Sequence, residues 1–278
     1  MKPTMESKRQ PKANRKQRPI ALTIAGSDSG GGAGIQADLK TFAALGVHGT
    51  SAITCLTAQN PRRVLAVEAC TPKMLRQQIE AVFGELPPAA VKTGMLYTAA
   101  NIKIVAKFFR GRNRPLIVDP LMVSTSGSRL LQPDAERLLV KDLLPLATLI
   151  TPNLDEAGVL TGAQIDSPEA MRTAARSLHA RFGCAVLVKG GHLKGTREAA
   201  DIFFDGRTEL LLTAPFVRGI QTHGTGCTYS AAICAGIARG ETLPQALKSA
   251  KQFVTSVIRN SYRIGKHFGL GQTTKYDI

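Results

Sequence analysis

Two glycine-rich segments of this sequence could bind a phosphate group. The first, GSDSGGGAG at residues 26–34, leads into a predicted helix. Glycines at this density let the backbone approach a ligand closely and leave amide groups to donate to it. The second, THGTGC at residues 222–227, leads directly into a helix of small residues. Its last four residues would place consecutive amides at the helix N-terminus, an anion hole that stabilises charge on a transferring phosphoryl group.

Two other nucleotide-binding patterns are weak or absent. Residues 32–37 fit the dinucleotide pattern G-x-G-x-x-A, but no acidic residue lies between Asp38 and Glu68, where that motif needs one. The Walker A pattern G-x-x-x-x-G-K-[ST] does not occur in the sequence. The first observation argues against a nicotinamide-dependent enzyme, and the second excludes a Walker A loop.

Cys227 is the residue of the second segment that could act as a base. At the positive end of a helix the pKa of a thiol, ordinarily about 8.5, can fall towards neutrality and match the working pH. A buried, inert cysteine at a helix start is an equally open interpretation of the spacing alone. His223, in the same segment, is interpreted as structural rather than catalytic.

Polar residues at other predicted strand ends could serve the same centre. Asp119 closes one strand, and Asn153, Asp155 and Glu156 follow the next. Their oxygens could face one ATP–Mg²⁺ complex, because Mg²⁺ keeps most of its water and needs few protein ligands. Asn153 and Asp155 could equally cap a helix, and Asp119 could simply end its strand.

Two further side chains follow predicted strands. Lys189 ends an apolar strand and precedes two glycines, a position that favours phosphate binding over a solvated face. Gln59 follows the second strand, and its amide offers both a donor and an acceptor to the edge of a heterocycle.

The elements that would position these residues alternate between apolar, β-branched stretches and helical patterns, which is typical of parallel βαβ units. Strands are predicted at 20–25, 51–57, 90–93, 116–119, 149–151, 185–189, 201–204 and 209–213. Helices are predicted at 35–45, 72–83, 99–109, 134–143, 167–181, 228–239 and after Thr242. The last two strands are joined by Asp205-Gly206-Arg207, which predicts a hairpin at the edge of a mostly parallel α/β sheet. Ligands of such sheets bind at the carboxyl ends of the strands.

Composition predicts one soluble catalytic domain at residues 20–278 after a basic tail at residues 1–19. The chain has 278 residues, 44% of them hydrophobic, and a net charge of +16. The tail carries seven basic residues against Glu6 and no apolar periodicity, so it is expected to be disordered. It lacks interleaved aromatic residues, and nucleic-acid binding is therefore not expected.

The sequence also predicts a cytoplasmic protein with no membrane partner. No apolar run approaches the roughly 18 residues of a membrane span, and the N-terminus has no apolar stretch typical of a signal peptide. The five cysteines are odd in number, widely spaced and without a C-x-x-C pair, which suits a reducing compartment.

Eight blocks, in order between residues 20 and 260, carry a family resemblance. They are AGSD at 25–28, QADLKT at 36–41, AQN at 58–60, KTGM at 92–95, VDP at 118–120, ITPNLDEA at 150–157, KGGH at 189–192 and HGTGC at 223–227. Together they resemble the hydroxymethylpyrimidine/phosphomethylpyrimidine kinases of the ribokinase superfamily. That resemblance implies a three-layer α/β sandwich on a mostly parallel sheet with antiparallel edge strands, commonly assembled as a homodimer.

The activity implied by the resemblance is two successive ATP-dependent phosphorylations in thiamine biosynthesis. The first acts on the hydroxymethyl group of 4-amino-5-hydroxymethyl-2-methylpyrimidine, and the second converts the monophosphate to the pyrophosphate. The resemblance makes Gly26, Asp38, Gln59 and Met95 the pyrimidine pocket, with Asp38 and Gln59 reading the amino group and nitrogens of the ring.

The resemblance also implies roles in phosphoryl transfer. Cys227 stands where much of the superfamily has an aspartate base, and a cysteine there is typical of the pyrimidine kinases. By the same resemblance, the anion-hole amides belong to Gly224, Thr225, Gly226 and Cys227. Lys189 and Asn153 would bind the ATP phosphates, and Glu156 and Asp119 would act on Mg²⁺ directly or through water.

Two alternatives stay open at this point. Pyridoxal kinases of the same superfamily phosphorylate a hydroxymethyl group on a pyridine ring, although Asp38, Gln59 and Met95 together favour the pyrimidine. A nucleic-acid-binding or regulatory protein on an inactive kinase scaffold is the other alternative, suggested only by the basic tail. The resemblance gives that tail no role.

Overall fold

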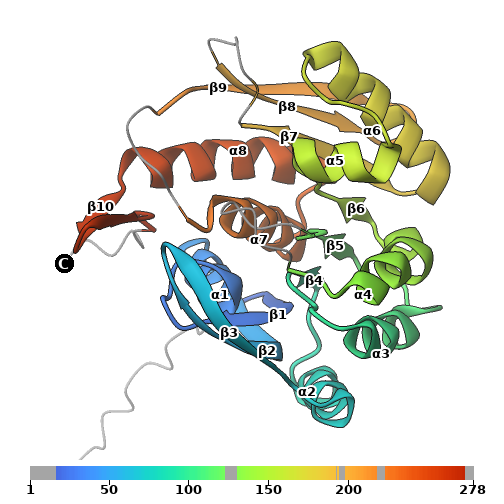
Figure 1. Ribbon diagram of the computed structural model, residues 1–278, viewed down its shortest axis with the longest axis vertical. Coiled ribbons are helices and arrows are strands. Elements are labelled where there is room, and N and C mark those ends of the chain that lie inside the picture. The colour runs from blue at the N-terminus through green and yellow to red at the C-terminus, as the bar shows by residue number, and fades with distance from the viewer. Residues whose placement is uncertain (1–16, 123–129, 192, 194–197, 218–222, 273–278) are drawn as a thin grey trace, which may run out of the picture.

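A nine-stranded sheet forms the centre of the computed structural model, which describes residues 17–122, 130–191, 193, 198–217 and 223–272 (Figure 1). Its order is β3-β2-β1-β4-β5-β6-β7-β8-β9. The strands are β1 (Ile20–Asp28), β2 (His48–Asn60), β3 (Arg63–Ala69), β4 (Ala90–Thr93), β5 (Leu116–Val118), β6 (Leu149–Ile150), β7 (Ala185–Gly190), β8 (Glu198–Phe204) and β9 (Glu209–Pro215). The six central strands, β2, β1, β4, β5, β6 and β7 in sheet order, run parallel to one another. Strand β3 at one edge and strands β8 and β9 at the other are antiparallel to their neighbours. The predicted α/β class with antiparallel edge strands is confirmed.

Helices cover both faces of the sheet and make three layers (Figure 1). The helices are α1 (Gly34–Ala44), α2 (Pro72–Glu85), α3 (Ala99–Phe109), α4 (Pro133–Leu138), α5 (Leu154–Thr161), α6 (Pro168–Phe182), α7 (Thr225–Ala238) and α8 (Leu243–Arg259). Neighbouring residues of β1 belong to opposite cores: Leu22 lies in the core that contains residues of α2, α3 and α6, and Ala21 lies in the core that contains residues of α7 and α8. Burial on both faces explains why the central strands are continuous apolar runs.

The predicted elements lie where the sequence placed them, with boundaries shifted by a few residues. The hairpin of β8 and β9 turns on Asp205, whose carboxylate accepts hydrogen bonds from the amides of Arg207 and Thr208. The helix predicted at 134–143 is in fact α4 followed by a π-helical turn at Leu139–Leu143. Residues 1–16 of the predicted tail lie outside the described residues.

Four elements were not predicted. Strand β3 pairs with β2 as an exposed edge, and the short hairpin of β10 (Tyr262–Ile264) and β11 (His267–Gly269) follows α8. Helix α5 begins at the residues interpreted as a possible metal site. No helix in the described parts of the chain is long and apolar enough to cross a membrane.

Candidate active site

The two glycine-rich segments meet at the carboxyl edge of the sheet. Gly224 caps α7 with φ of 88°, and a Cβ atom at this position would lie 1.8 Å from the carbonyl oxygen of Gly32. The backbones touch, so only glycine fits at residue 224. The first intrahelical hydrogen bond of α7 joins Thr228 N–H to Gly224 O, so the amides of Gly226 and Cys227 are not used within the helix ladder. The predicted Thr222 lies outside the described residues.

Asp28 organises the first glycine segment from within. Its carboxylate accepts hydrogen bonds from the backbone N–H groups of Gly30, Gly32 and Ala33 at 2.8, 3.1 and 2.8 Å. Burial raises the pKa of Asp28, but the hydrogen bonds from His223 and from the Gly30 and Ala33 amides lower it further, so that the pKa lies below its ordinary value. The prediction that these amides are left to donate to a ligand is therefore wrong for this loop, because Asp28 already takes them.

His223 joins the two segments to Gln59. Its Nε2 lies 3.1 Å from Asp28 Oδ2 and 2.9 Å from Gln59 Nε2, while the Thr57 hydroxyl lies within hydrogen-bonding distance of both Gln59 Oε1 and Ser27 O. One hydroxyl proton cannot serve two acceptors, and one imidazole nitrogen cannot both donate and accept. Turning the Gln59 amide over removes the conflict at Thr57, whose oxygen then accepts from the NH₂ group while its proton goes to Ser27 O. At His223, the one Nε2 proton is then shared between Asp28 Oδ2 and the Gln59 oxygen. Either way, the amide predicted to read the pyrimidine also holds the site together.

Asp38 lies in a different place from the one predicted. It is completely buried, and its oxygens accept two hydrogen bonds from Lys92 Nζ at 2.7 and 2.8 Å and one from the Thr23 hydroxyl at 2.6 Å. A carboxylate enclosed by these partners is not presented to the edge of a ring. The predicted direct contact between Asp38 and the pyrimidine is therefore corrected: Asp38 holds Lys92.

Gly26 and Met95 do lie together, as predicted for one pocket wall. A Cβ at Gly26 would lie 2.8 Å from Cys55 Sγ and 3.7 Å from Met95 Sδ. A side chain at residue 26 would therefore clash with Cys55, and glycine keeps the space beside Met95 open. The Thr54 hydroxyl donates to Met95 O at 2.6 Å and fixes the backbone beside the wall.

The Cys227 thiol is in the predicted place but not in the predicted ionisation state. The residue is only 5% exposed at the start of α7. Burial raises the pKa of Cys227 to about 11, and the positive charge of Lys92 and the backbone amide of Gly34 only partly oppose this. The direction of this shift is opposite to the lowered pKa that was predicted, because desolvation raises the pKa of the thiol more than Lys92 and the Gly34 amide lower it. At pH 7 roughly one thiol in ten thousand is then ionised.

Lys189 reaches the helix N-terminus from the neighbouring strand. Its Nζ lies 3.6 Å from the position of a Cβ at Gly226 and donates to Asp119 Oδ1 at 2.9 Å. Asp119 also accepts from the Thr151 hydroxyl at 3.2 Å, and the Ser230 hydroxyl of α7 lies 3.1 Å from Asp119 Oδ2 and equally far from the carbonyl oxygens of Gly226 and Cys227. This brings a cation and helix-terminal amides to one point, which suits an anionic phosphate.

Asn153 and Glu156 form a capping box for α5. Asn153 Oδ1 accepts from Glu156 N–H at 2.8 Å, and Glu156 accepts from the N–H groups of Asn153 and Met122 at 2.9 and 3.2 Å. The capping interpretation of Asn153 is thus confirmed. The pKa of Glu156 is raised to about 7. Burial is the main cause and the charge of Asp119 adds to it, while the charge of Lys189 partly opposes both.

These carboxylates suit a weakly ligated cation rather than a closed metal cage. The described residues contain no group of three His, Cys, Asp or Glu side chains that could hold a metal ion. Asp119 and Glu156 lie close enough to influence each other, and the single charge of Lys189 does not neutralise both. The donor set therefore fits Mg²⁺ that keeps its waters and the phosphates of a nucleotide as its main ligands.

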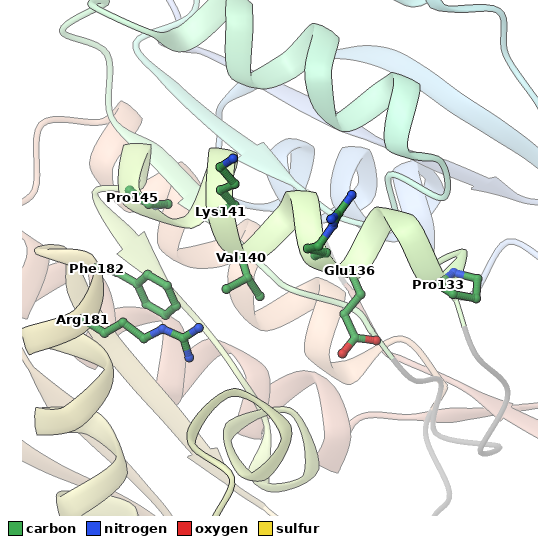
Figure 2. Close-up of a pocket in the computed structure, with 8 residues that line it drawn as sticks. Pro133, Glu136, Val140, Lys141, Pro145, Arg181 and Phe182 are labelled. Atoms are coloured by element: carbon green, nitrogen blue, oxygen red, sulfur yellow. The ribbon is translucent and has the colours of Figure 1, made fainter.

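Several residues of this centre were given no role from sequence, among them Thr23, Asp28, Lys92 and Ser230. Lys92 carried a signal, because a lysine inside the apolar strand β4 must be paired if it is buried. A separate cavity of about 710 Å³ lies between α4, the π-helical turn and the end of α6 (Figure 2). None of the predicted site residues lines it.

Comparison with known proteins gives consistent results. A sequence profile described as "Phosphomethylpyrimidine kinase" matches residues 28–272. The hydroxymethylpyrimidine/phosphomethylpyrimidine kinase of Rhizobium meliloti is 51% identical over 246 residues, covering 88% of this chain and 92% of that protein.

Two solved structures are also similar. The phosphomethylpyrimidine kinase of Clostridium difficile has a TM-score of 0.77 at 42% identity, covering 87% of this chain and all of that one. The pyridoxal kinase of Bacillus subtilis, solved as an ADP complex, has a TM-score of 0.86 at 36% identity, covering 93% and 98%.

Proposed function

Because this chain belongs to the phosphomethylpyrimidine kinase family, we propose that the N-terminus of α7 is the point at which it transfers a phosphoryl group. The chain is a kinase of thiamine biosynthesis that uses ATP to phosphorylate 4-amino-5-hydroxymethyl-2-methylpyrimidine and then its monophosphate. The observation that carries the assignment of the centre is the convergence of Lys189, the Gly226 backbone and Cys227 at one helix end. Electrostatic stabilisation at such a point is the main contribution a protein makes to phosphoryl transfer.

In the first reaction, the hydroxymethyl oxygen attacks the γ-phosphorus in line with the departing ADP oxygen. The O–H bond breaks, its proton passes to the Cys227 thiolate, and the bond from the γ-phosphorus to the bridging oxygen of ADP breaks. Lys189 and the amides at Gly226 and Cys227 offset the charge on the transferred group. Because the transition state is loose, the oxygen holds its proton until late, and a sparsely populated thiolate is a sufficient acceptor.

Mg²⁺, when bound to ATP, supplies further neutralisation of phosphate charge. Asp119 and Glu156 would act on it directly or through water, and Asn153 would lie beside the phosphates with Lys189. Support comes from the position of Asn153 next to Lys189, where the two residues form a parallel bridge.

The experiment that tests the centre is Cys227→Ala with the two reactions measured separately. The second acceptor is a phosphate monoester, which is largely ionised at neutral pH and needs little help from a base. Cys227→Ala should therefore slow phosphorylation of the alcohol more than phosphorylation of the monophosphate, by about 10²-fold or more. Equal losses in the two rates would remove the base role from Cys227.

A pyridoxal kinase activity is the second candidate, favoured by the similarity to the Bacillus subtilis pyridoxal kinase. The pyrimidine-kinase relatives are closer in sequence, at 42% and 51% identity against 36%. Release of ADP measured with each substrate separates the two, and a higher kcat/KM with pyridoxal would reverse the preference.

Three other predictions remain proposals: a homodimer, a cytoplasmic location and the absence of nucleic-acid binding. The exposed side chains of Leu56 and Leu65, on the edge pair β2 and β3, support self-association. The five cysteines are all unpaired, which supports a reducing compartment. Light scattering would test the dimer, and retention on a polynucleotide with and without residues 1–19 would test the tail.

A further inference from the structure

A second buried carboxylate lies beside Lys189, on the neighbouring strand. Asp201 of β8 is 2% exposed and stands directly opposite Lys189 of β7 in the antiparallel register. Residues directly opposite each other in an antiparallel pair project their side chains from the same face of the sheet, with Cβ atoms about 5 Å apart. Two buried aspartates therefore neighbour the lysine of the proposed phosphate site, namely Asp119 and Asp201.

The face that carries Lys189 and Asp201 is the one against which α7 and α8 pack. Leu187 and Phe203, two residues along the same two strands, belong to the core that also holds residues of α7 and α8. Because side chains alternate between the two faces of a sheet, Lys189 and Asp201 face the same helices. The contacts agree, since Lys189 reaches the start of α7 and Asp201 pairs with Lys251 of α8.

Both carboxylate oxygens of Asp201 have a partner other than Lys189. Oδ2 accepts from Lys251 Nζ at 2.6 Å, and Oδ1 accepts from the backbone N–H of Gly190 at 2.9 Å. Lys251 is itself only 7% exposed, so the ion pair is enclosed by the packing of α8 on the sheet. Asp201 thus joins the last residue of β7 to α8, while the ammonium group of Lys189 donates to Asp119 instead.

The main chain at Lys189 is held on both sides of β7. On one side the Lys189 N–H donates at 2.9 Å to the carbonyl oxygen of Pro152, in the loop before α5. On the other side the next N–H, that of Gly190, donates to Asp201. The backbones of β7 and β8 are in close contact here, because a Cβ at Gly190 would lie 2.2 Å from the carbonyl oxygen of Ala200. The strand end from which Lys189 projects is therefore fixed before any ligand binds.

We propose that Asp201, held by Lys251, is a positioning residue that fixes the end of β7 so that the ammonium group of Lys189 points at the phosphates of ATP. Asp201 touches neither ATP nor the acceptor in this role, and it acts through the N–H of Gly190. Lys251 neutralises a carboxylate that would otherwise compete with phosphate for Lys189. The inference rests on the proposed role of Lys189 as a phosphate ligand.

The test compares two variants of the full chain that both lack the charges of the ion pair. The acceptor-free variant, Asp201→Leu with Lys251→Met, leaves the Gly190 N–H without its acceptor. The acceptor-keeping variant, Asp201→Asn with Lys251→Met, retains an oxygen at that position. Replacing a buried ion pair by apolar residues of similar volume is usually tolerated by a fold. The matched control is Arg172→Met with Glu209→Gln, which removes an ion pair between α6 and β9.

The quantity measured is the Kd of the ATP analogue AMP-PCP with Mg²⁺, by titration calorimetry. The acceptor-free variant should raise this Kd about tenfold, as expected for one weakened charge-assisted hydrogen bond to phosphate. The acceptor-keeping variant should restore most of the lost affinity, and the control should bind as the parent does. An unchanged Kd in the acceptor-free variant overturns the proposal. An equal loss in the acceptor-keeping variant or in the control also overturns it, because the Gly190 N–H would then not matter.

A double-mutant cycle with Lys189→Met shows whether Asp201 acts through Lys189. In the Lys189→Met background the acceptor-free exchange should change the Kd by less than about twofold, because the contact that it supports is already gone. The same loss in both backgrounds overturns the proposal and leaves the phosphate role of Lys189 standing. An unchanged Kd in Lys189→Met alone removes that role and this proposal with it, whereas the base role of Cys227 is tested by its own variant.

Hydrogen exchange of the Gly190 amide needs no substitution, so it tests the proposal even where the acceptor-free variant does not fold. In the parent without nucleotide this amide should exchange at least about 10²-fold more slowly than an unprotected amide, because Asp201 holds it before ATP binds. Exchange at the unprotected rate overturns the proposal.

Steady-state kinetics separate positioning of Lys189 from a general disturbance of the fold. The acceptor-free variant should raise KM for ATP and leave KM for the hydroxymethylpyrimidine within about twofold of the parent, because Asp201 lies on the side of the site that holds Lys189. A parallel rise of both KM values overturns the proposal.

Discussion

Gly224→Ala tests whether contact between the two glycine-rich segments builds the phosphate site. A side chain at a φ of 88° costs about 1–2 kcal/mol in the left-handed region. A Cβ there would also lie 1.8 Å from Gly32 O, so the backbones must separate by at least about 1.2 Å to restore a tolerable contact. Because a misplacement of about 1 Å can cost 10²-fold in rate, we expect kcat/KM for both acceptors to fall about 100-fold.

Gly183→Ala is the matched control for backbone strain. Gly183 ends α6 with φ of 72°, and a Cβ there would meet no atom within 4 Å. This variant should lose about 1 kcal/mol of unfolding free energy and retain parent activity. ADP release with each acceptor gives the rates, and urea unfolding gives the stabilities. If Gly224→Ala keeps kcat/KM within about threefold of Gly183→Ala, the meeting of the two segments does not set the transfer geometry.

Two further predictions concern Lys189 and Glu156, two charged residues of the proposed site. Lys189→Met should raise KM for ATP and lower kcat, because it removes the cation near Gly226 and leaves Asp119 buried without its ion pair. Initial rates at varied ATP concentrations give KM and kcat. In the folded chain Glu156 keeps its proton up to about pH 7, whereas in the unfolded chain it releases the proton near pH 4.5. Folding therefore takes up a proton between these pH values, and the free energy of unfolding should fall as pH rises through that range. The loss is at most about 3 kcal/mol; urea unfolding without ATP or Mg²⁺ should show it in the parent and not in Glu156→Gln, and parallel pH curves would contradict it.

The order of strands and helices was readable from periodicity because most elements bury a regular apolar face. Strand β3 was missed because its residues are mostly exposed, so RVLAVEA has no buried face to enforce alternation. Helix α5 was missed because its cap, Asn153 with Glu156, was also a candidate metal site, and one carboxylate can serve both purposes. A local sequence pattern does not show whether such a carboxylate caps a helix, binds a metal ion or does both.

The structure brings Gly26 beside Met95 and places Lys189 near the start of α7 with Cys227, as expected, whereas the burial of Cys227 and the pairing of Asp38 were not foreseen. Cys227 was expected to ionise easily because the sequence shows a helix start and does not show how deeply the thiol is buried. Asp38 was expected to read the ring because the family resemblance implied that role, and its partner, Lys92, is 54 residues away in the sequence, where no local pattern connects the two. Both errors have the same cause: the pKa and the accessibility of a group depend on neighbours that only the fold brings together.

The two reactions ask one site to accept acceptors of different length. In the proposed mechanism Lys189 and α7 hold the transferred phosphoryl group in one position, so the pyrimidine ring would lie farther from them when a phosphate already intervenes. The Met95 backbone is held by Thr54, but its thioether lies against the space left by Gly26 and has three rotatable bonds. We therefore expect the adjustment between the two steps to occur at the Met95 side chain, where an unbranched residue can repack, rather than at the rigid junction of the glycine-rich segments.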